Sequence, residues 1–226
     1  MLTLGKVQPS GEFSALRISP ERPTWIQDII DRSRPDVKGL EMWQRRYKEM
    51  NWGRVSYGLY KAILAAKHGI SCLFGTWGVK LIRKDGEILD YGLVSTRVVT
   101  TVGVNFLVDA LQNLVEPEIL KYHGIGTTNT AEAVGDTALA AELTTQYNPD
   151  NTRATGTTTE GASANIYRTV GTNLVDAGAT IVEAGIFSVA TVGSGVLLDR
   201  GIFGGITMSS GDSLQTTYEL TIAAGG

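Results

Sequence analysis

The stretch Tyr122-His123-Gly124-Ile125-Gly126-Thr127-Thr128 decides the fold, because it opens a long series of Thr- and Gly-rich segments. The 46 residues from Thr127 to Thr172 contain 13 threonines. Threonine is β-branched and favours extended strands, and its hydroxyl keeps the exposed face of a sheet polar without adding charge. The sequence therefore predicts a β domain whose surface suits assembly or binding better than catalysis.

Six strands are predicted downstream of residue 118, separated by clusters of Gly, Asn, Asp and Ser. They span about Ile119–Ile125, Arg153–Glu160, Ser163–Val170, Thr180–Val189, Gly195–Phe203 and Ser213–Ala223. This spacing is typical of an antiparallel β-sandwich of the jelly-roll or immunoglobulin-like kind. Between the first two strands, Asp136 is expected to cap a short helix that runs through Leu143.

The last of these strands has the clearest alternation of apolar and polar residues. One face is expected to carry Leu214, Thr216, Tyr218, Leu220 and Ile222, and the other Gln215, Thr217, Glu219 and Thr221. The first face is predicted to be buried, and the second to face water or another subunit.

A β-hairpin is predicted upstream, because Asp85-Gly86 joins two apolar runs at Val79–Arg83 and Ile88–Leu93. A helix near residues 101–114, marked by Val104, Leu107, Val108 and Leu111 and ended by Pro117, is expected to cover the sheets. Residues 76–226 are therefore assigned to a β-sandwich domain with a covering helix, which makes the chain mainly β, and α+β overall.

Residues 1–75 are predicted to form an extended and partly helical N-terminal arm. The first 22 residues lack periodicity, and helices are expected at Trp25–Ser33, at about Leu40–Met50 and at Val55–Lys67. Gly69 stands where a left-handed residue commonly ends a helix.

Charge divides the chain into two unlike parts. Residues 1–100 hold 16 Lys and Arg against 10 Asp and Glu, a net charge of +6, whereas residues 101–226 hold 4 against 13, a net charge of −9. The basic part is expected to pack on an acidic surface, which leaves nucleic acid, another protein or the acidic part of a neighbouring copy as candidates. A solvated helical region that is simply rich in Arg explains the same pattern. A hydrophobic content of 42% argues against global disorder.

Aromatic, apolar and basic residues of the arm form the candidate interface with a capsid or with another subunit. These residues are Trp25, Ile29, Ile30, Trp43, Arg45, Arg46, Tyr47, Trp52 and Arg54. Aromatic rings between arginines can stack on bases, but they more often serve helix interfaces, so a nucleic-acid partner is not expected.

The sequence offers no specific catalytic, cofactor or metal site. His68 and His123 are the only histidines, and the single Cys72 excludes an internal disulfide and a zinc site of recognised spacing. Glu183 and Asp199 are a carboxylate pair that can face each other across a sheet. We expect no enzyme activity, no cofactor and no bound metal. No run reaches the roughly 18 apolar residues of a membrane span, so no membrane partner is expected.

Several short motifs resemble, in order, a domain of tailed-phage virion proteins. The motifs are Gly124-Ile125-Gly126-Thr127-Thr128, Thr130-Ala131-Glu132-Ala133, Gly135-Asp136-Thr137-Ala138-Leu139 with Glu142, Glu183-Ala184-Gly185-Ile186-Phe187, Val196-Leu197-Leu198-Asp199-Arg200 and Gly211-Asp212-Ser213-Leu214. They cover about half of the chain, while the first 90 residues match no family that we can name.

The resemblance implies a β-rich, non-enzymatic structural protein of the virion. The leading hypothesis is a capsid decoration (cement) protein on the capsid surface, with the major capsid protein and further copies of itself, as a dimer or trimer, as partners. A tail, baseplate or head-tail connector component is the alternative in the same class. A host-receptor or carbohydrate binding module is a second alternative, for which Tyr147, Tyr167 and Tyr218 are the candidate aromatics of the β domain.

Overall fold

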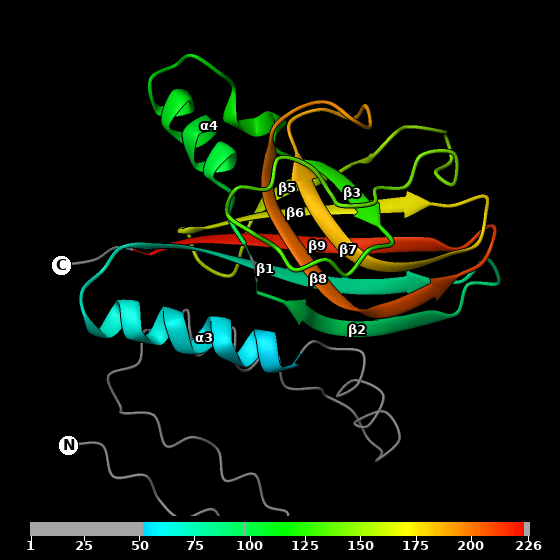
Figure 1. Cartoon of the computed structure of the whole chain (residues 1–226), viewed down its shortest axis with the longest axis horizontal. Helices are drawn as coiled ribbons and strands as arrows, with labels where there is room; N and C mark the ends of the chain where they lie inside the picture. The colour runs from blue at the N-terminus through cyan, green and yellow to red at the C-terminus, as the bar shows by residue number, and fades with distance from the viewer. Residues whose placement is uncertain (1–51, 97, 224–226) are drawn as a thin grey trace, which may run out of the picture.

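The described part of the chain, residues 52–96 and 98–223, forms two antiparallel sheets and two α-helices in a computed structural model. Sheet A has the strand order β2 (Ile88–Ser95), β1 (Cys72–Ile82), β9 (Ser213–Ala223), β6 (Ile166–Leu174) and β5 (Thr157–Glu160). Sheet B has the order β4 (Ala154–Thr155), β3 (Tyr122–Gly126), β7 (Ala179–Phe187) and β8 (Leu197–Met208). In Figure 1 the strands of sheet A run horizontally, and β7 and β8 cross them. The prediction of a mainly β, antiparallel fold is confirmed.

The core lies between the two sheets, where inward side chains of sheet A meet those of sheet B. Trp77 of β1 and Tyr218 of β9 are fully buried, and their ring centroids lie 4.9 Å apart. Ile125 of β3 and Ile186 of β7 are buried in the same cluster. Burial of such large side chains supplies the main driving force for closing the two sheets on each other.

The bounds of β9 match the predicted strand, but its final residues reverse the expected burial. Leu214, Tyr218 and Leu220 are buried as predicted, whereas Ile222 is exposed and Thr221 is buried. Thr221 pairs with Phe74 of β1, and both residues are buried. The outer face of sheet A is therefore covered at this end. Ile222 keeps the same face as Leu220, because the register of β9 is unbroken, but its predicted burial is wrong.

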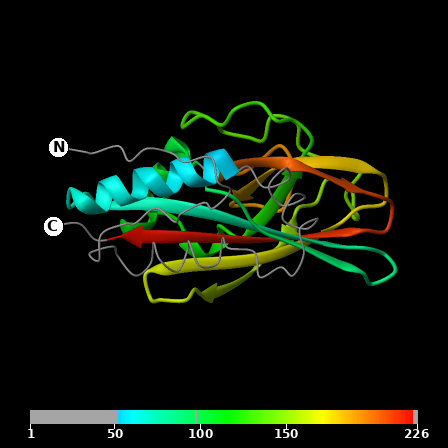
Figure 2. The ribbon, with the colours of Figure 1, turned by 90° about the horizontal axis from the view of Figure 1, so that it is seen from below.

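Helix α3 (Trp52–Lys67) runs alongside β1 and contacts both β1 and β2 of sheet A, and it lies below these strands in Figure 1 and next to β1 in Figure 2. Its apolar face buries Val55, Leu59 and Ala62 in the common core. The helix ends as predicted, with Gly69 at a φ of 64°. The boundary expected between the arm and the sandwich domain, at residues 75 and 76, falls inside β1. Helix α3, which was predicted as part of the arm, packs on sheet A.

Helix α4 (Thr101–Leu111) confirms the predicted covering helix. Thr100 caps it: its Oγ1 accepts a hydrogen bond from the Gly103 N–H at 3.0 Å. Gly103 lies so close to β8 that a Cβ there would stand 2.6 Å from the Leu198 carbonyl oxygen. The helix therefore packs through Gly103 and Phe106, its two buried residues. The predicted apolar stripe of Val104, Val108 and Leu111 is exposed instead.

The predicted hairpin forms between β1 and β2, with Ile82 opposite Ile88 and Gly86 at a φ of 91°. The segment predicted as one strand from Arg153 to Glu160 divides at Gly156, so that β4 belongs to sheet B and β5 to sheet A. The Thr-rich pattern is the same on both sides of this change, which is why periodicity did not reveal it. The strand expected from Ile119 begins only at Tyr122, after the short 3-10 helix η1 (Pro117–Ile119).

The helix predicted from Asp136 to Leu143 is wrong. This segment forms turns and an isolated bridge between Gly126 and Glu142. The Thr127 N–H donates to the Ala141 carbonyl at 2.9 Å, and the Leu143 N–H donates to Ile125 at 3.0 Å. These backbone bonds tie the segment to β3 and replace the bonds that a helix would make within itself.

Candidate functional site

The best-defined polar centre of the described chain is Arg200, which β8 directs to the outer face of sheet B. Its Nε donates to Glu183 at 2.9 Å, its Nη1 to Asp136 at 2.8 Å and its Nη2 to the Thr130 carbonyl at 3.0 Å. Both Arg200 and Glu183 are buried. One guanidinium therefore joins β8, β7 and two points of the segment between β3 and β4.

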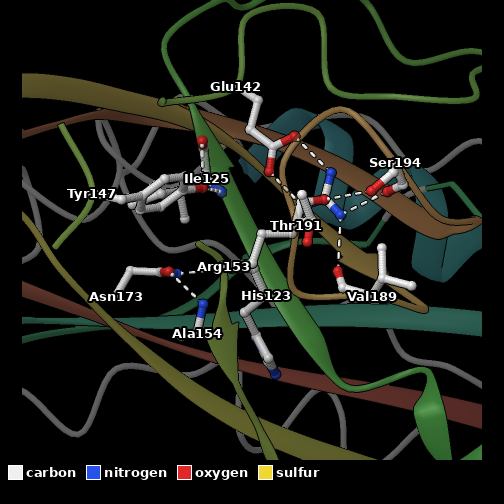
Figure 3. Close-up of polar contacts among 10 residues, drawn as sticks. All are labelled: His123, Ile125, Glu142, Tyr147, Arg153, Ala154, Asn173, Val189, Thr191 and Ser194. Carbon is white, nitrogen blue, oxygen red and sulfur yellow. Dashed lines mark hydrogen bonds and ion pairs between the residues drawn. The ribbon is translucent and has the colours of Figure 1, made fainter. Parts of the chain in front are cut away.

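A second buried guanidinium, Arg153, lies at the other end of that segment. Figure 3 shows Arg153 between the Glu142 carboxylate and two backbone carbonyls. Its Nε and Nη2 donate to the two oxygens of Glu142 at 2.6 and 2.9 Å, and its Nη1 donates to the Val189 and Ser194 carbonyls, each at 2.9 Å. The guanidinium carbon lies 3.4 Å from the centroid of the Phe187 ring. This planar, bidentate pairing uses nearly all of the donors of Arg153.

The two arginines hold residues 127–153 against the outer face of sheet B. Glu183 adds to this attachment by accepting the Ala140 and Ala141 N–H groups at 3.1 and 2.8 Å. Breaking such a buried pair leaves an uncompensated charge, so these contacts enforce one position of the segment. Asp136, Glu142, Glu183 and Arg200 belong to the motifs that carry the virion-protein resemblance. Those motifs therefore attach a covering loop to the sheet.

Tyr147 and Asn173 make further attachments near the same face (Figure 3). The Tyr147 hydroxyl accepts the Ile125 N–H at 2.7 Å and donates to the Ile125 carbonyl at 3.1 Å. Asn173 of β6 donates to the His123 carbonyl at 3.0 Å and accepts the Ala154 N–H at 2.9 Å. Through Asn173, sheet A holds β3 and β4 of sheet B.

Asp199 is a buried carboxylate between the two sheets. It accepts hydrogen bonds from Trp77 Nε1 at 3.0 Å and from the Tyr218 hydroxyl at 3.1 Å. Burial raises the pKa of Asp199 to about 8, because a charged carboxylate is poorly solvated there. Asp199 precedes Arg200 in β8, so the two side chains point to opposite faces of sheet B. Asp199 and Glu183, the partner of Arg200, therefore do not form the pair that the sequence suggested.

His123 is an interior residue of β3. Its Nδ1 pairs with the Thr216 hydroxyl at 2.7 Å and its Nε2 with the Thr169 hydroxyl at 3.1 Å. Its ring meets Trp77 edge-on at a centroid distance of 6.4 Å. Burial lowers the pKa of His123 to about 3, so the ring is neutral near pH 7. Its ring nitrogens serve to join the sheets.

Two hollows lie on sheet A. One, of about 290 Å³, separates α3 from β1 and is lined by residues that include Tyr57, Lys61, Leu73 and Phe74. The other, of about 190 Å³, lies on the outer face over β1, β2 and β9 and is lined by polar and apolar residues. Among the described residues, no group of three or more His, Cys, Asp or Glu is placed to hold a metal ion. Within the same ranges, no helix has the length and the apolar composition needed to cross a membrane.

The candidate interface residues of the arm lie outside the described part of the chain. This holds for Trp25, Ile29, Ile30, Trp43, Arg45, Arg46 and Tyr47, and for the side chains of Trp52 and Arg54, whose backbone begins α3. Their role stays a prediction. The structure adds the exposed residues of α3 and α4 as candidates. Apolar spacing in α4 was visible in the sequence, but it was interpreted as core.

Comparison of the chain with protein-family models, with curated protein sequences and with solved structures finds no match.

Proposed function

We propose that the chain is a structural protein of a tailed-phage virion, and most specifically a capsid decoration (cement) protein. One observation carries the proposal: the charged residues of the resembling motifs form ion pairs and hydrogen bonds within the fold. Arg200, Glu183 and Asp136 attach the covering segment to sheet B, as does the Glu142 pair with Arg153. These motifs hold a loop firmly on the sandwich. Residues with this use favour a structural protein that presents its surfaces to neighbouring subunits.

The proposed partners are the major capsid protein and further copies of the chain. The basic N-terminal region supplies the contact with the capsid through the aromatic and arginine residues named above. A second, tethered contact raises the effective concentration of the first and increases avidity without a large single interface. The β domain provides the surfaces for self-association.

The aromatic residues of the β domain favour this role over a carbohydrate or receptor binding module. Tyr147 and Tyr218 are buried, and the Tyr167 hydroxyl donates to the Leu120 carbonyl at 2.7 Å. Sugar-binding sites usually present exposed aromatic faces, and these three rings are engaged in packing or internal hydrogen bonds. A tail, baseplate or connector position uses the same scaffold and is distinguished by experiment.

Electron cryomicroscopy of virions produced by the strain that encodes the chain tests the proposal. We expect peptides of the chain in the purified particles, and extra density repeated over the icosahedral shell. Particles made after deletion of the coding sequence are the control, and they should lack that density. Density confined to the tail or portal vertex would move the chain to the alternative position, and virions without its peptides would overturn a virion role.

A further inference from the structure

Helix α3 carries a basic, aromatic surface, part of which borders the hollow between α3 and β1. Tyr57 is 48% exposed and Tyr60 is 54% exposed. Lys61 and Lys67 are also exposed, and the Lys61 ammonium lies 4.7 Å from the centroid of the Tyr57 ring. Residues 55–70 contain no Asp or Glu. The outer face of α3 is therefore a cationic surface with two large rings.

Helix α4 and the turn after it present the opposite character. Val104, Val108 and Leu111 form a stripe at helical spacing that is 37%, 47% and 88% exposed, and Leu114 beyond it is 67% exposed. Isolated exposed apolar residues are ordinary, but a continuous stripe on one helix commonly marks a contact surface.

The charge around this stripe is acidic. Residues 101–119 contain Asp109, Glu116 and Glu118 and no Lys or Arg. Glu116 and Glu118 are exposed, and Asp109 is partly exposed on α4 itself. The α4 surface therefore complements the α3 surface in both of its properties, with apolar side chains to receive the tyrosine rings and carboxylates to receive the lysines.

One copy of the chain cannot bring its own two surfaces together. In Figure 1, α3 lies below the strands of sheet A, next to β1 and β2, and α4 lies above these strands and contacts β8. Each helix is attached to the body through buried residues, Val55 and Leu59 in α3 and Gly103 and Phe106 in α4. The complementary surfaces are thus available only to different copies.

We propose that the α3 surface of one copy docks on the α4 surface of a second copy. Tyr57 and Tyr60 cover the apolar stripe, and Lys61 and Lys67 approach Glu116 and Glu118, which follow its C-terminal end. Two packed helices come within about 8–10 Å of each other, a distance that lets both sets of side chains meet. Opposite charges steer the approach and select this orientation more than they add affinity.

This contact joins unlike surfaces, so it is heterologous and repeats from copy to copy. Such contacts close into a ring or extend as an open array, and each contact can be weak because an array has many. The inference rests on the proposed function only for the expectation of self-association, because the contact involves no capsid. Particle imaging and an experiment on the isolated chain can therefore fail independently.

Sedimentation velocity of the purified full-length chain over a range of concentrations tests the contact. We expect the mean mass of the wild type to rise with concentration. Leu111→Asp on α4 and Tyr60→Asp on α3 should each weaken association at least ten-fold. Ile88→Asp is the matched control: Ile88 is 61% exposed but lies at the β1–β2 hairpin, and its substitution should leave association unchanged.

Mixing the two disabled variants distinguishes this contact from a symmetric one. A pair of Leu111→Asp and Tyr60→Asp chains retains one intact α3 surface and one intact α4 surface, so the mixture should form dimers and nothing larger. A wild type that remains monomeric at every concentration would overturn the proposal. So would association that survives both substitutions, or association lost with Leu111→Asp and unaffected by Tyr60→Asp, which would indicate an α4–α4 contact.

Discussion

Asp199 and His123 show how single buried groups set the pH response of the fold. Both are fully buried between the sheets, and burial disfavours the charged form of each. For His123 the pKa falls to about 3, below the ordinary value of 6.5, so stability is lost as the pH falls from 6.5 toward 3. For Asp199 the pKa rises from 3.8 to about 8. The contribution of Asp199 to the stability of the fold is therefore full below pH 3.8 and is lost as the pH rises through 8.

Asp199→Asn should remove the loss of stability on the alkaline side. Asparagine resembles the protonated carboxyl: its oxygen can accept from Trp77, its amide can donate to Tyr218, and it does not ionise. Between pH 6.5 and pH 8 we expect the free energy of unfolding of the wild type to fall by about 2 kcal/mol, at about 1.4 kcal/mol per pH unit, and that of the variant to stay nearly constant. Urea unfolding across this range measures both profiles.

The range above pH 6.5 is chosen because His123 is neutral in the folded chain and at least half neutral in the unfolded chain there, so its own effect on the profile is small. Asp176→Asn is the control, since Asp176 is an exposed carboxylate and its substitution should preserve the wild-type profile. Parallel pH profiles for wild type and Asp199→Asn would show that Asp199 does not bind its proton more tightly in the folded state.

At the scale of elements, the transfer of the chain from sheet B to sheet A takes place at one residue, Gly156. Its N–H donates to the Lys121 carbonyl at 2.7 Å, while the residues before and after it pair with β3 and β6. A Cβ on Gly156 would stand 2.7 Å from both the Lys121 oxygen and His123 Nε2, closer than such atoms approach in proteins. Only glycine allows the backbone to pass between the sheets here.

Gly156→Ala should therefore destabilise the protein by about 1–3 kcal/mol, the usual cost of inserting a methyl group into a filled space. Thermal unfolding followed by circular dichroism measures the change. Gly135→Ala is the matched control, because no atom lies within 4 Å of a Cβ at that position, and the variant should unfold like the wild type. An unaltered melting temperature for Gly156→Ala would mean that this crossing has room that the structure does not show.

Elements with local signals were predicted well, and those that depend on distant partners were not. Asp85-Gly86 specifies a turn by its own chemistry, and the alternation in Ser213–Ala223 defines a strand without reference to its neighbours. The segment from Asp136 to Leu143 carries a plausible cap, but its backbone groups bond to β3 instead. Likewise, the inner side of α4 was misjudged because the close fit of Gly103 on Leu198 is a property of two elements together.

At the scale of the whole molecule, α3 and the two sheets share one hydrophobic core. Val55, Leu59 and Ala62 belong to the same buried cluster as Trp77 and Tyr218. Gly58 lies against Thr96 at the end of β2, which brings the helix close to the sheet. We therefore expect the helix and the sandwich to unfold together.

Leu59→Ala should lower the free energy of unfolding of the entire described body by about 2–5 kcal/mol, the usual range for a buried leucine. Guanidinium unfolding, followed in parallel by far-UV circular dichroism for the helices and by near-UV circular dichroism for the packed aromatic rings, measures it. Lys67→Ala, an exposed position of the same helix, should have little effect. If α3 unfolded before the sheets, the two signals would separate, and the helix would count as part of an independent arm.

Less of the candidate site than of the fold could be predicted from the sequence. The polar motifs were recognised, but Arg200, Glu183 and Asp136 come from three separate segments, and only the folded chain shows that they form one cluster. Arg153 belongs to none of the motifs, and its pairing with Glu142 across a folded loop has no sequence signal. The anchors expected in residues 25–54 remain predictions.

The central place of β9 in sheet A has a consequence for synthesis on the ribosome. β9 lies between β1 and β6, with Cys72 opposite Ala223 and Thr169 opposite Tyr218. Until residues 213–223 have emerged, sheet A exists as two separate hairpins with open edges, and open edges invite pairing with other chains. The nascent chain therefore completes this sheet only after residues 213–223 have been synthesised, and translation products that end before β9 should aggregate and be degraded.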